Sequence, residues 1–470
     1  MIVLLLLTFS LSLDVTIIAN YAANTTKGNS LVDAVNKSQG YTSTDYFPFV
    51  FNIFVIEGSL TESDFQSERA SFTDLYPHLV TFYISPNVTI INDTIPSYSF
   101  ANHDWIENIT INCKISIIQE KACFNSQNLK TFNAYQLISI ENEVFLQCNK
   151  LISFNAPNLE KCKISAFLGC SSLLSVNLPK LQEIPAFCFS DCTSMHTAIF
   201  NSCSIIRTCA FQKCLNLVNV TLPLVTKAES KIFSNCGFLR EISMPLLTDI
   251  PSYCFNDCGA LVSFDVGNPT VIGEYSFKNC ISVEEINFSG VKAIGPGCFS
   301  NCLRLTKVCL PLVQSIPKSS FFYCISLVDI TFSDIESIDT FSFYECNSIQ
   351  EISFPLLQEV PDYSFSYCAA LKTLNIPSIT KIGIKSFSYC SSLTYVEFDN
   401  LTDADSGAFS YCASLRNVTL PHLQSAGSRL FEECRCLIFL SLPVVSFCGS
   451  SLVSNCPLIT ILELPSLVEC

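Results

Sequence analysis

The cysteines are the residues of this chain with the greatest capacity for chemistry. There are 27 of them in 470 residues, and fifteen recur at an unbroken spacing of 22 residues, from Cys148 to Cys456. We call these fifteen residues the cysteine ladder. A thiol can form a disulfide, bind a metal or act as a nucleophile. The spacing decides between these roles, because it fixes where the thiols lie relative to one another.

Three cysteines outside the ladder lie four residues ahead of a ladder cysteine and form C-x₃-C pairs, which are Cys188 with Cys192, Cys254 with Cys258, and Cys298 with Cys302. Each pair could be a local disulfide, a metal pair or two buried thiols, and we favour buried thiols. Zinc needs four ligands, and the four histidines are scattered over distant parts of the sequence (His78, His103, His196 and His422). The sequence therefore predicts no metal site and no cofactor.

Catalytic motifs are not found in the sequence. It has no G-x-S-x-G nucleophile turn, no H-E-x-x-H zinc motif and no glycine-rich phosphate loop. His103 stands where a ladder cysteine would fall, and a nucleophile–base pair with Cys123 can be imagined, but we interpret His103 as a core residue. We expect no enzymatic activity and no small-molecule substrate.

The ladder belongs to a longer repeat. Fourteen phenylalanines, from Phe145 to Phe431, lie three residues ahead of ladder cysteines. A fixed period between about 20 and 50 residues is typical of a solenoid, in which each unit buries its apolar face against its neighbours. We number each repeat from its cysteine as position 0.

Each repeat predicts one short strand. Positions +3, +6 and +8 are apolar and positions +5 and +7 are mostly polar, which is the alternation of a strand with one buried face. Proline at +9 in ten repeats ends the strand. Apolar residues at +11 and +14 lie on the return path, where we expect a single helical or 3₁₀ turn. The side opposite the strands should therefore be thin.

This pattern resembles a known family. The stretch 361–398, PDYSFSYCAALKTLNIPSITKIGIKSFSYCSSLTYVEF, carries an aromatic residue, then cysteine, then leucine, then a strand that closes on proline. It resembles the BspA-like branch of the leucine-rich repeats. The resemblance implies an α/β-type repeat solenoid, wound as a right-handed coil with one short parallel strand per repeat. It also implies a recognition surface for adhesion or host contact that performs no chemistry of its own.

The repeats divide the chain into three parts. About eighteen leucine-rich repeats occupy residues 72–470, and the last stops at Cys470 before its own Phe-x-x-Cys. We expect that the chain is truncated there. Residues 20–71 form an N-terminal segment and cap. Residues 1–19 are a candidate signal peptide, because Met1 to Leu13 are apolar apart from three hydroxyls. A buried N-terminal strand is the alternative.

The solenoid also predicts the state of the ladder thiols. Stacked turns repeat about every 4.8 Å, so equivalent side chains lie side by side with parallel Cα–Cβ vectors. A disulfide needs Cβ atoms about 3.8 Å apart, which parallel vectors do not readily provide. We therefore interpret the ladder cysteines as free, small core residues.

Charge and sequons indicate the setting in which the chain works. Its net charge of −15 repels nucleic acid, and no basic stripe counteracts it. Nine N-x-S/T sequons are candidate glycosylation sites in a secreted or cell-surface protein, at Asn24, Asn36, Asn87, Asn92, Asn108, Asn219, Asn287, Asn400 and Asn417. No apolar run is long enough to span a bilayer, so membrane anchorage would need a missing C-terminal segment.

The residues at +5 and +7 are the candidate binding surface, which we call the strand face. Its predicted partner-binding residues are Glu241, Asp265, Glu285, Lys307, Asp329, Glu351, Tyr395 and Glu397. Such an acidic face suits a basic protein or a glycan. We predict a secreted or surface-displayed binding protein that mediates adhesion or partner recognition. The alternatives are a self-assembling structural coat and an intracellular protein-interaction scaffold.

Overall fold

The computed structural model describes residues 15–20, 51–65 and 79–468. They divide into two compact units, unit 1 (Met1–Leu246) and unit 2 (Leu247–Cys470). Residues 1–14 of the candidate signal peptide lie outside the described residues, and so do Asn24, Asn36 and His78. The strand β1 (Val15–Asn20) pairs in parallel with β2 (Phe51–Leu60). The signal peptide and the N-terminal cap stay predictions.

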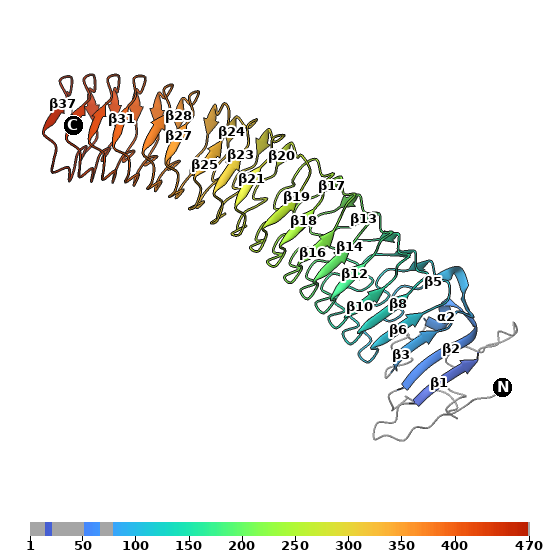
Figure 1. Ribbon diagram of the computed structural model, residues 1–470. Coiled ribbons are helices and arrows are strands. Elements are labelled where there is room, and N and C mark those ends of the chain that lie inside the picture. Colours follow the sequence, from blue (N-terminus) through green and yellow to red (C-terminus); the bar gives the residue numbers. More distant parts are fainter. Residues whose placement is uncertain (1–14, 21–50, 66–78, 469–470) are drawn as a thin grey trace. The chain divides into compact units, whose positions relative to one another are not determined.

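Unit 1 is built on a column of parallel strands that continues from β2 (Figure 1). One strand per turn holds positions +5 to +7, and each pairs in register with the equivalent strand 22 or 23 residues further along. These strands are β3 (Leu79–Ile84), β6 (Asn108–Ile111), β8 (Thr131–Ala134), β10 (Ser153–Asn155), β12 (Ser175–Asn177), β14 (Thr197–Ile199), β16 (Asn219–Thr221) and β18 (Glu241–Ser243). A short strand β4 (Val88–Ile90) also pairs with β2.

A second, shorter strand lies on the return path of most turns. In unit 1 these strands form two parallel sheets, from β5 (Thr94–Ile95), β7 (Ile117–Ile118), β9 (Ser139–Ile140) and β11 (Lys161–Cys162), and from β13 (Glu183–Ile184), β15 (Ile205–Ile206) and β17 (Lys227–Ala228). The described helices are brief. The helix α2 (Glu62–Phe65) follows Thr61, which donates its N–H and hydroxyl to the Asp64 carboxylate, and η1 spans Ile91–Asp93.

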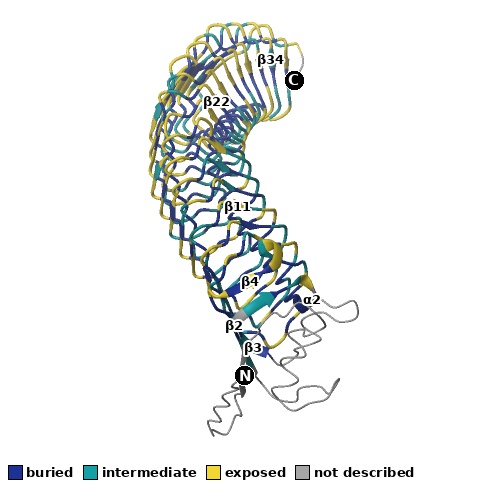
Figure 2. Ribbon diagram, turned by 90° about the vertical axis from the view of Figure 1, so that its right-hand side faces the viewer, coloured by how far each residue is buried: buried dark blue, intermediate teal, exposed yellow. Residues whose placement is uncertain are grey.

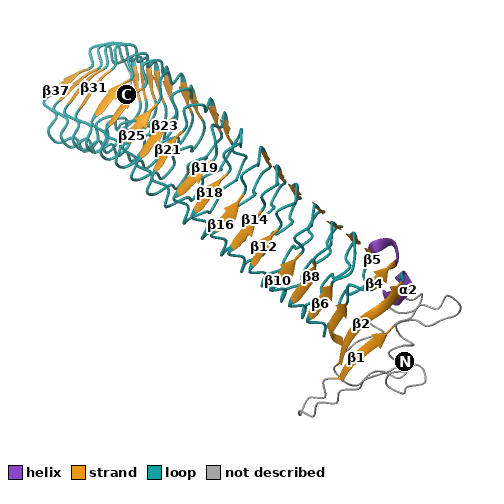
Figure 3. Ribbon diagram, turned by 45° about the vertical axis from the view of Figure 1, so that its right-hand side comes forward, coloured by secondary structure: helices purple, strands orange, loops and turns teal. Residues whose placement is uncertain are grey.

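Unit 2 repeats the same two columns (Figure 3). The strands at +5 to +7 are β19 (Ser263–Asp265), β21 (Glu285–Asn287), β23 (Lys307–Cys309), β25 (Asp329–Thr331), β27 (Glu351–Ser353), β29 (Thr373–Asn375), β31 (Tyr395–Glu397), β33 (Asn417–Thr419), β35 (Phe439–Ser441) and β37 (Ile461–Glu463). The return strands are β20 (Val271–Ile272), β22 (Ala293–Ile294), β24 (Ser315–Ile316), β26 (Ser337–Ile338), β28 (Glu359–Val360), β30 (Lys381–Ile382), β32 (Asp403–Ala404), β34 (Ser425–Ala426) and β36 (Phe447–Cys448).

The predicted fold class is confirmed, with two corrections of detail. The repeat is a 22-residue turn of a parallel-strand solenoid with almost no helix. The return path, however, carries a two-residue strand and hydrogen-bonded turns in place of the expected helical or 3₁₀ turn. Most turns therefore hold two strands and not one. A two-residue strand leaves too short an alternation to be read from sequence.

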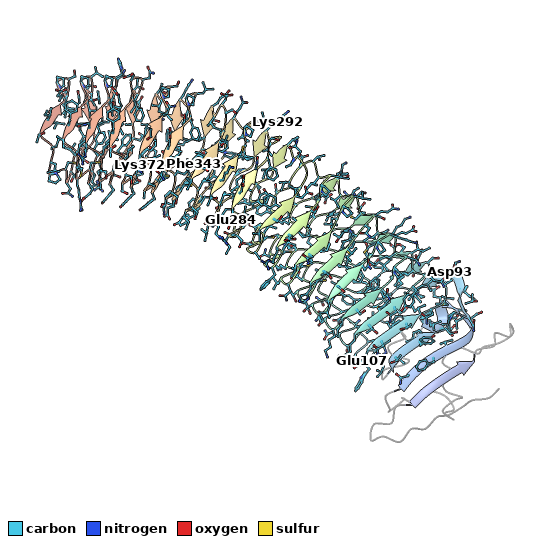
Figure 4. The ribbon with its side chains drawn as sticks, viewed as in Figure 1. Asp93, Glu107, Glu284, Lys292, Phe343 and Lys372 are labelled. Carbon is cyan, nitrogen blue, oxygen red and sulfur yellow. The ribbon has the colours of Figure 1, made fainter. Side chains whose placement is uncertain are left out.

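The core of each unit lies inside the coil, where successive side chains of one type stack (Figure 2). Ladder phenylalanines stack with ring centroids 5.1–5.4 Å apart in unit 1 and 5.2–5.7 Å apart in unit 2. Phe343, labelled in Figure 4, is one of these rings. Offset aromatic stacking adds about 0.5–1.5 kcal/mol per pair beyond the burial of apolar area. The repeated phenylalanine therefore holds adjacent turns in register.

The Phe-x-x-Cys corner has an unusual backbone. Positions −5 and −1 take positive φ in turn after turn, as at Glu143 (φ 57°) and Gln147 (φ 61°). This conformation turns alternate N–H groups toward the next turn, so that Phe145 N–H reaches Ala166 O at 2.7 Å and Gln147 N–H reaches Leu168 O at 2.8 Å. The hydrogen bonds between turns offset the steric cost of positive φ in non-glycine residues.

Candidate partner-binding face

The strand face has the alternation that the sequence predicts. Along β21, Glu285 and Asn287 are exposed on either side of the buried Ile286, and β27 and β31 show the same pattern. Because consecutive strands are parallel and in register, residues at +5 form one row and residues at +7 form another. The polar side chains of each unit are therefore gathered on one surface of that unit.

Three of the predicted residues form a continuous charged row in unit 2. Glu285 pairs in register with Lys307, and Lys307 pairs with Asp329 on the next strand. The Lys307 ammonium lies 3.3 Å from the Glu285 carboxylate, and both side chains are about half exposed. The single cation on this part of the face is thus held by one acidic neighbour, while Asp329 stays exposed.

The remaining predicted residues are distributed along the same surface. In unit 2, Asp265 lies on β19 and Glu351 on β27, and both are exposed. Tyr395 on β31 donates its hydroxyl to the carboxylate of Glu397 two residues later. Glu241 lies on β18 in unit 1 and is also exposed.

The face is not uniformly polar. Cys309 and Phe439 are half-buried at +7 and +5 of their turns, and Ile461 is 48% exposed on β37. One further carboxylate, Glu284 (Figure 4), lies next to the row at +4 and forms an ion pair with Arg304. The acidic character of the unit 2 strand face therefore rests on five of the predicted carboxylates, namely Asp265, Glu285, Asp329, Glu351 and Glu397.

The ladder thiols lie behind this face and are not exposed to a partner. All fifteen are buried, as predicted, and those from Cys148 to Cys434 are 0% exposed. Most of them donate to the backbone carbonyl of the residue 25 positions earlier, at 3.0–3.3 Å, as Cys324 Sγ does to Phe299 O. Burial raises the pKa of the Cys148, Cys324, Cys368 and Cys412 thiols to about 12. These thiols are therefore protonated at neutral pH and are poor nucleophiles.

Two irregular repeats show what the ladder position requires. Ser126 replaces cysteine and donates its hydroxyl to Phe100 O, so it makes the same bond between turns. His103 is fully buried, as predicted, and its Nδ1 accepts the N–H groups of Trp105 and Ile106. The imidazole of His103 is therefore a structural acceptor, which agrees with its interpretation as a core residue.

The C-x₃-C pairs are buried as well. Both members of each pair are 0% exposed, in keeping with the favoured reading of buried thiols. Within residues 15–20, 51–65 and 79–468, no group of three or more His, Cys, Asp or Glu side chains is placed to hold a metal ion. No helix in these residues is long and apolar enough to cross a bilayer.

A comparison with protein families places the repeats. The model for the BspA type Leucine rich repeat region, which holds six copies, matches residues 93–217, 182–306, 248–372 and 358–469. The chain belongs to the BspA-type leucine-rich repeat family. The recognition made from the stretch 361–398 is thereby confirmed. No curated protein matches the chain.

Solved structures of bacterial leucine-rich repeat proteins resemble the BspA-type chain at low identity. A leucine-rich repeat protein from Bacteroides ovatus is 22% identical, with a TM-score of 0.49 over 74% of this chain and 87% of that one. A leucine rich cell surface protein from Faecalibacterium prausnitzii is 18% identical, with a TM-score of 0.37 over 75% and 84%. A leucine-rich repeat protein from Eubacterium ventriosum is 19% identical, with a TM-score of 0.38 over 63% and 88%.

The BspA-type repeats also form a feature that the sequence prediction missed. Tyr367, Tyr389 and Tyr411 occupy position −1 of three consecutive turns in unit 2, and their rings stack at 4.3 and 4.4 Å within 6° of parallel. Beside Tyr389 and Tyr411, Lys385, Arg429 and Glu432 help to line an open cavity of about 350 Å³. The 22-residue spacing of the tyrosines was visible in the sequence and could have indicated the stack.

The sequons of the BspA-type chain lie mostly on accessible surface. Asn219, Asn287 and Asn417 are exposed on the strand face, at +5, +7 and +5 of their turns. Among the others that the structure describes, Asn87, Asn92 and Asn400 are exposed and Asn108 is half-buried. All of them stay candidate glycosylation sites.

Proposed function

We propose that this leucine-rich repeat protein is a secreted or cell-surface binding protein without enzymatic activity, and that its strand face in unit 2 recognises a basic protein partner. Stacked-strand faces of solenoids generally bind other proteins over extended areas. The observation that carries the proposal is the acidic row, in which Asp329, Glu351 and Glu397 are exposed and the lone Lys307 is paired with Glu285.

Electrostatics favour a basic partner over an acidic one. Exposed like charges repel an acidic surface over about 10 Å at 0.1 M salt, and they accelerate the approach of a basic one. A glycan remains the alternative ligand, because serine, threonine and asparagine hydroxyls and amides occupy most of the other strand-face positions. A neutral glycan would bind without strong salt dependence, which separates the two classes of ligand.

The binding proposal is tested with a charged probe. A fluorescent oligolysine peptide is titrated into the purified chain and into the triple variant Glu285→Gln, Asp329→Asn, Glu351→Gln. The affinity of the variant should fall about tenfold at low salt, since each lost charge contributes a few tenths of a kcal/mol or more. An oligoglutamate peptide should not bind to either protein.

A matched control keeps the net charge constant and moves the neutralised carboxylates off the strand face. The triple variant Glu336→Gln, Glu359→Gln, Asp403→Asn removes three exposed carboxylates on the return path of unit 2. It should bind oligolysine almost as tightly as the unchanged chain. Equal losses in the two triple variants would show that net charge, and not the strand face, attracts the probe.

Surface exposure needs a separate measurement. An antibody against the repeats should label intact, unpermeabilised cells that produce the native protein, and protease added outside those cells should remove the signal. Labelling that requires permeabilisation would overturn the localisation while leaving the binding proposal standing. Enzymatic release of glycans, followed by mass measurement, tests Asn219, Asn287 and Asn417 as modified sites.

A further inference from the structure

Two cysteines in unit 1 face each other directly. Cys162 Sγ lies 3.4 Å from Cys188 Sγ, although the residues are 26 positions apart in the chain. This arrangement differs from that of the ladder thiols, which donate to backbone carbonyls of the preceding turn. The two sulfur atoms are about 1.4 Å further apart than the ~2.05 Å of a disulfide bond. Small torsional adjustments of two side chains can close that gap.

The pair is specific to this part of the solenoid. Cys162 is the second residue of β11 and occupies position +14, where neighbouring turns have Ile140 and Ile184. Cys188 occupies position −4, where the adjacent turns have Ala166 and Ala210. The apolar residues of the common repeat are replaced at both positions that meet. The thiol pair is therefore not a by-product of the 22-residue period.

The two thiols differ in access to solvent. Cys188 is fully buried, and burial raises the pKa of its thiol well above the ordinary value. Cys162 is half-buried, and its sulfur lies at the surface, 3.6 Å from the carbonyl of Lys163. An external reagent can therefore reach Cys162 directly, but can reach Cys188 only through Cys162.

We propose that Cys162 and Cys188 are a cross-linking site, which a small-molecule disulfide oxidises to a disulfide bond between turns. The Cys162 thiolate attacks one sulfur of the reagent, so that a mixed disulfide forms and one thiolate leaves. Cys188 then gives up its proton to water and attacks Cys162 Sγ, and the second half of the reagent leaves as a thiol. Two protein thiols are oxidised and one reagent disulfide is reduced to two thiols.

The bond would act as a staple within unit 1. It closes a loop of 26 residues across two turns, and such a loop restricts the unfolded chain. The oxidised form should therefore unfold at a higher temperature than the reduced form. This inference does not rest on the proposed function, because it concerns the reactivity of the purified chain.

The experiment uses oxidised glutathione as the reagent. The full chain is incubated with it at pH 8, remaining thiols are blocked with N-ethylmaleimide, and the protein is digested and analysed by mass spectrometry. We expect a linked pair of peptides containing Cys162 and Cys188, which is lost after reduction. Ladder cysteines of the same unit, such as Cys170 and Cys214, should stay unlinked. Recovery of Cys162 and Cys188 as separately blocked thiols would overturn the proposal.

Two variants distinguish the assigned order of attack. Cys188→Ser should accumulate one glutathione on Cys162, because no second thiol can displace it. Cys162→Ser should leave Cys188 unmodified, because the reagent cannot reach a buried thiol. If Cys188 gains glutathione in the Cys162→Ser variant, the assignment of Cys162 as the attacking thiol is wrong. The linked peptide from the unchanged chain is measured without any variant, so it does not depend on how the variants fold.

Discussion

Cys170 donates its thiol to the backbone carbonyl of Phe145, 3.1 Å away in the preceding turn. The same carbonyl accepts the N–H of Cys148 at 3.1 Å, so one oxygen joins two consecutive ladder residues. The thiol therefore has two roles, as a small apolar group in the core and as a donor between turns. This relation explains why the ladder position accepts serine at Ser126 and not a larger apolar residue.

Substitutions at Cys170 should separate these two roles. Cys170→Ser keeps a donor of similar size, so we expect the free energy of unfolding to change by about 1 kcal/mol or less. Cys170→Leu adds volume to a closely packed core and should lower it by about 1–3 kcal/mol. Urea unfolding followed by circular dichroism measures both changes. Equal losses for serine and leucine would show that the donor is irrelevant to the ladder.

Stability should decline in alkaline solution. Burial raises the pKa of Cys324, Cys368 and Cys412 from 9.0 to about 12, so the folded chain keeps protons that the unfolded chain releases above pH 9. The stabilisation is complete below pH 9 and is lost as the pH rises toward 12. Each thiol contributes up to about 1.4 kcal/mol per pH unit in that window. Thermal unfolding between pH 8 and pH 11 measures the slope.

The matched control for this slope is a chain with fewer buried thiols. The double variant Cys324→Ser, Cys368→Ser keeps the hydrogen bonds between turns but removes two titrating groups. Its unfolding temperature should fall less steeply with pH than that of the unchanged chain. An identical slope in both proteins would assign the alkaline instability to groups other than the ladder thiols.

The sequence predicted those parts of the fold in which residue type repeats with position. Phenylalanine at −3, cysteine at 0 and apolar residues at +6 recur because each packs against its own copy in the next turn, and this made the solenoid and its buried ladder predictable. The exposed strand face followed from the same alternation. The return strands were missed because two residues do not establish a period.

Other features depend on backbone conformation or on a single turn. Positive φ at −1 is shared by Gln147, Asp191, Lys213 and Tyr389, residue types with no common preference, so hydrogen bonding between turns and not side-chain chemistry selects it. The contact of Cys162 with Cys188 occurs outside the ladder and has no repeat to reveal it. Sequence periodicity could not have predicted either feature.

Position −1 offers a direct test of this backbone conformation. Gln147 is exposed with φ 61°, and Gly169 takes the same position in the next turn with φ 76°. Gln147→Gly should be neutral or stabilising by up to about 1 kcal/mol, because glycine adopts positive φ without steric cost. Gln147→Val should be destabilising by about 1–3 kcal/mol, because a β-branched residue disfavours that region. Thermal unfolding compares the two, and a valine variant as stable as the glycine variant would contradict the assigned conformation.

Lys307 tests whether the strand face can be changed without affecting the fold. Its ion pair with Glu285 is about half exposed, and such pairs contribute about 0–1 kcal/mol, so Lys307→Gln should hardly change the unfolding temperature. The substitution removes the one cation from the Glu285–Asp329 row, and oligolysine should bind more tightly at low salt. This gain should vanish at high salt, where exposed charges are screened. Lys292→Gln, which removes an exposed lysine at +12, outside the strand face (Figure 4), is the matched control. Equal gains from both substitutions would locate the attraction in the net charge of the protein and not in this row.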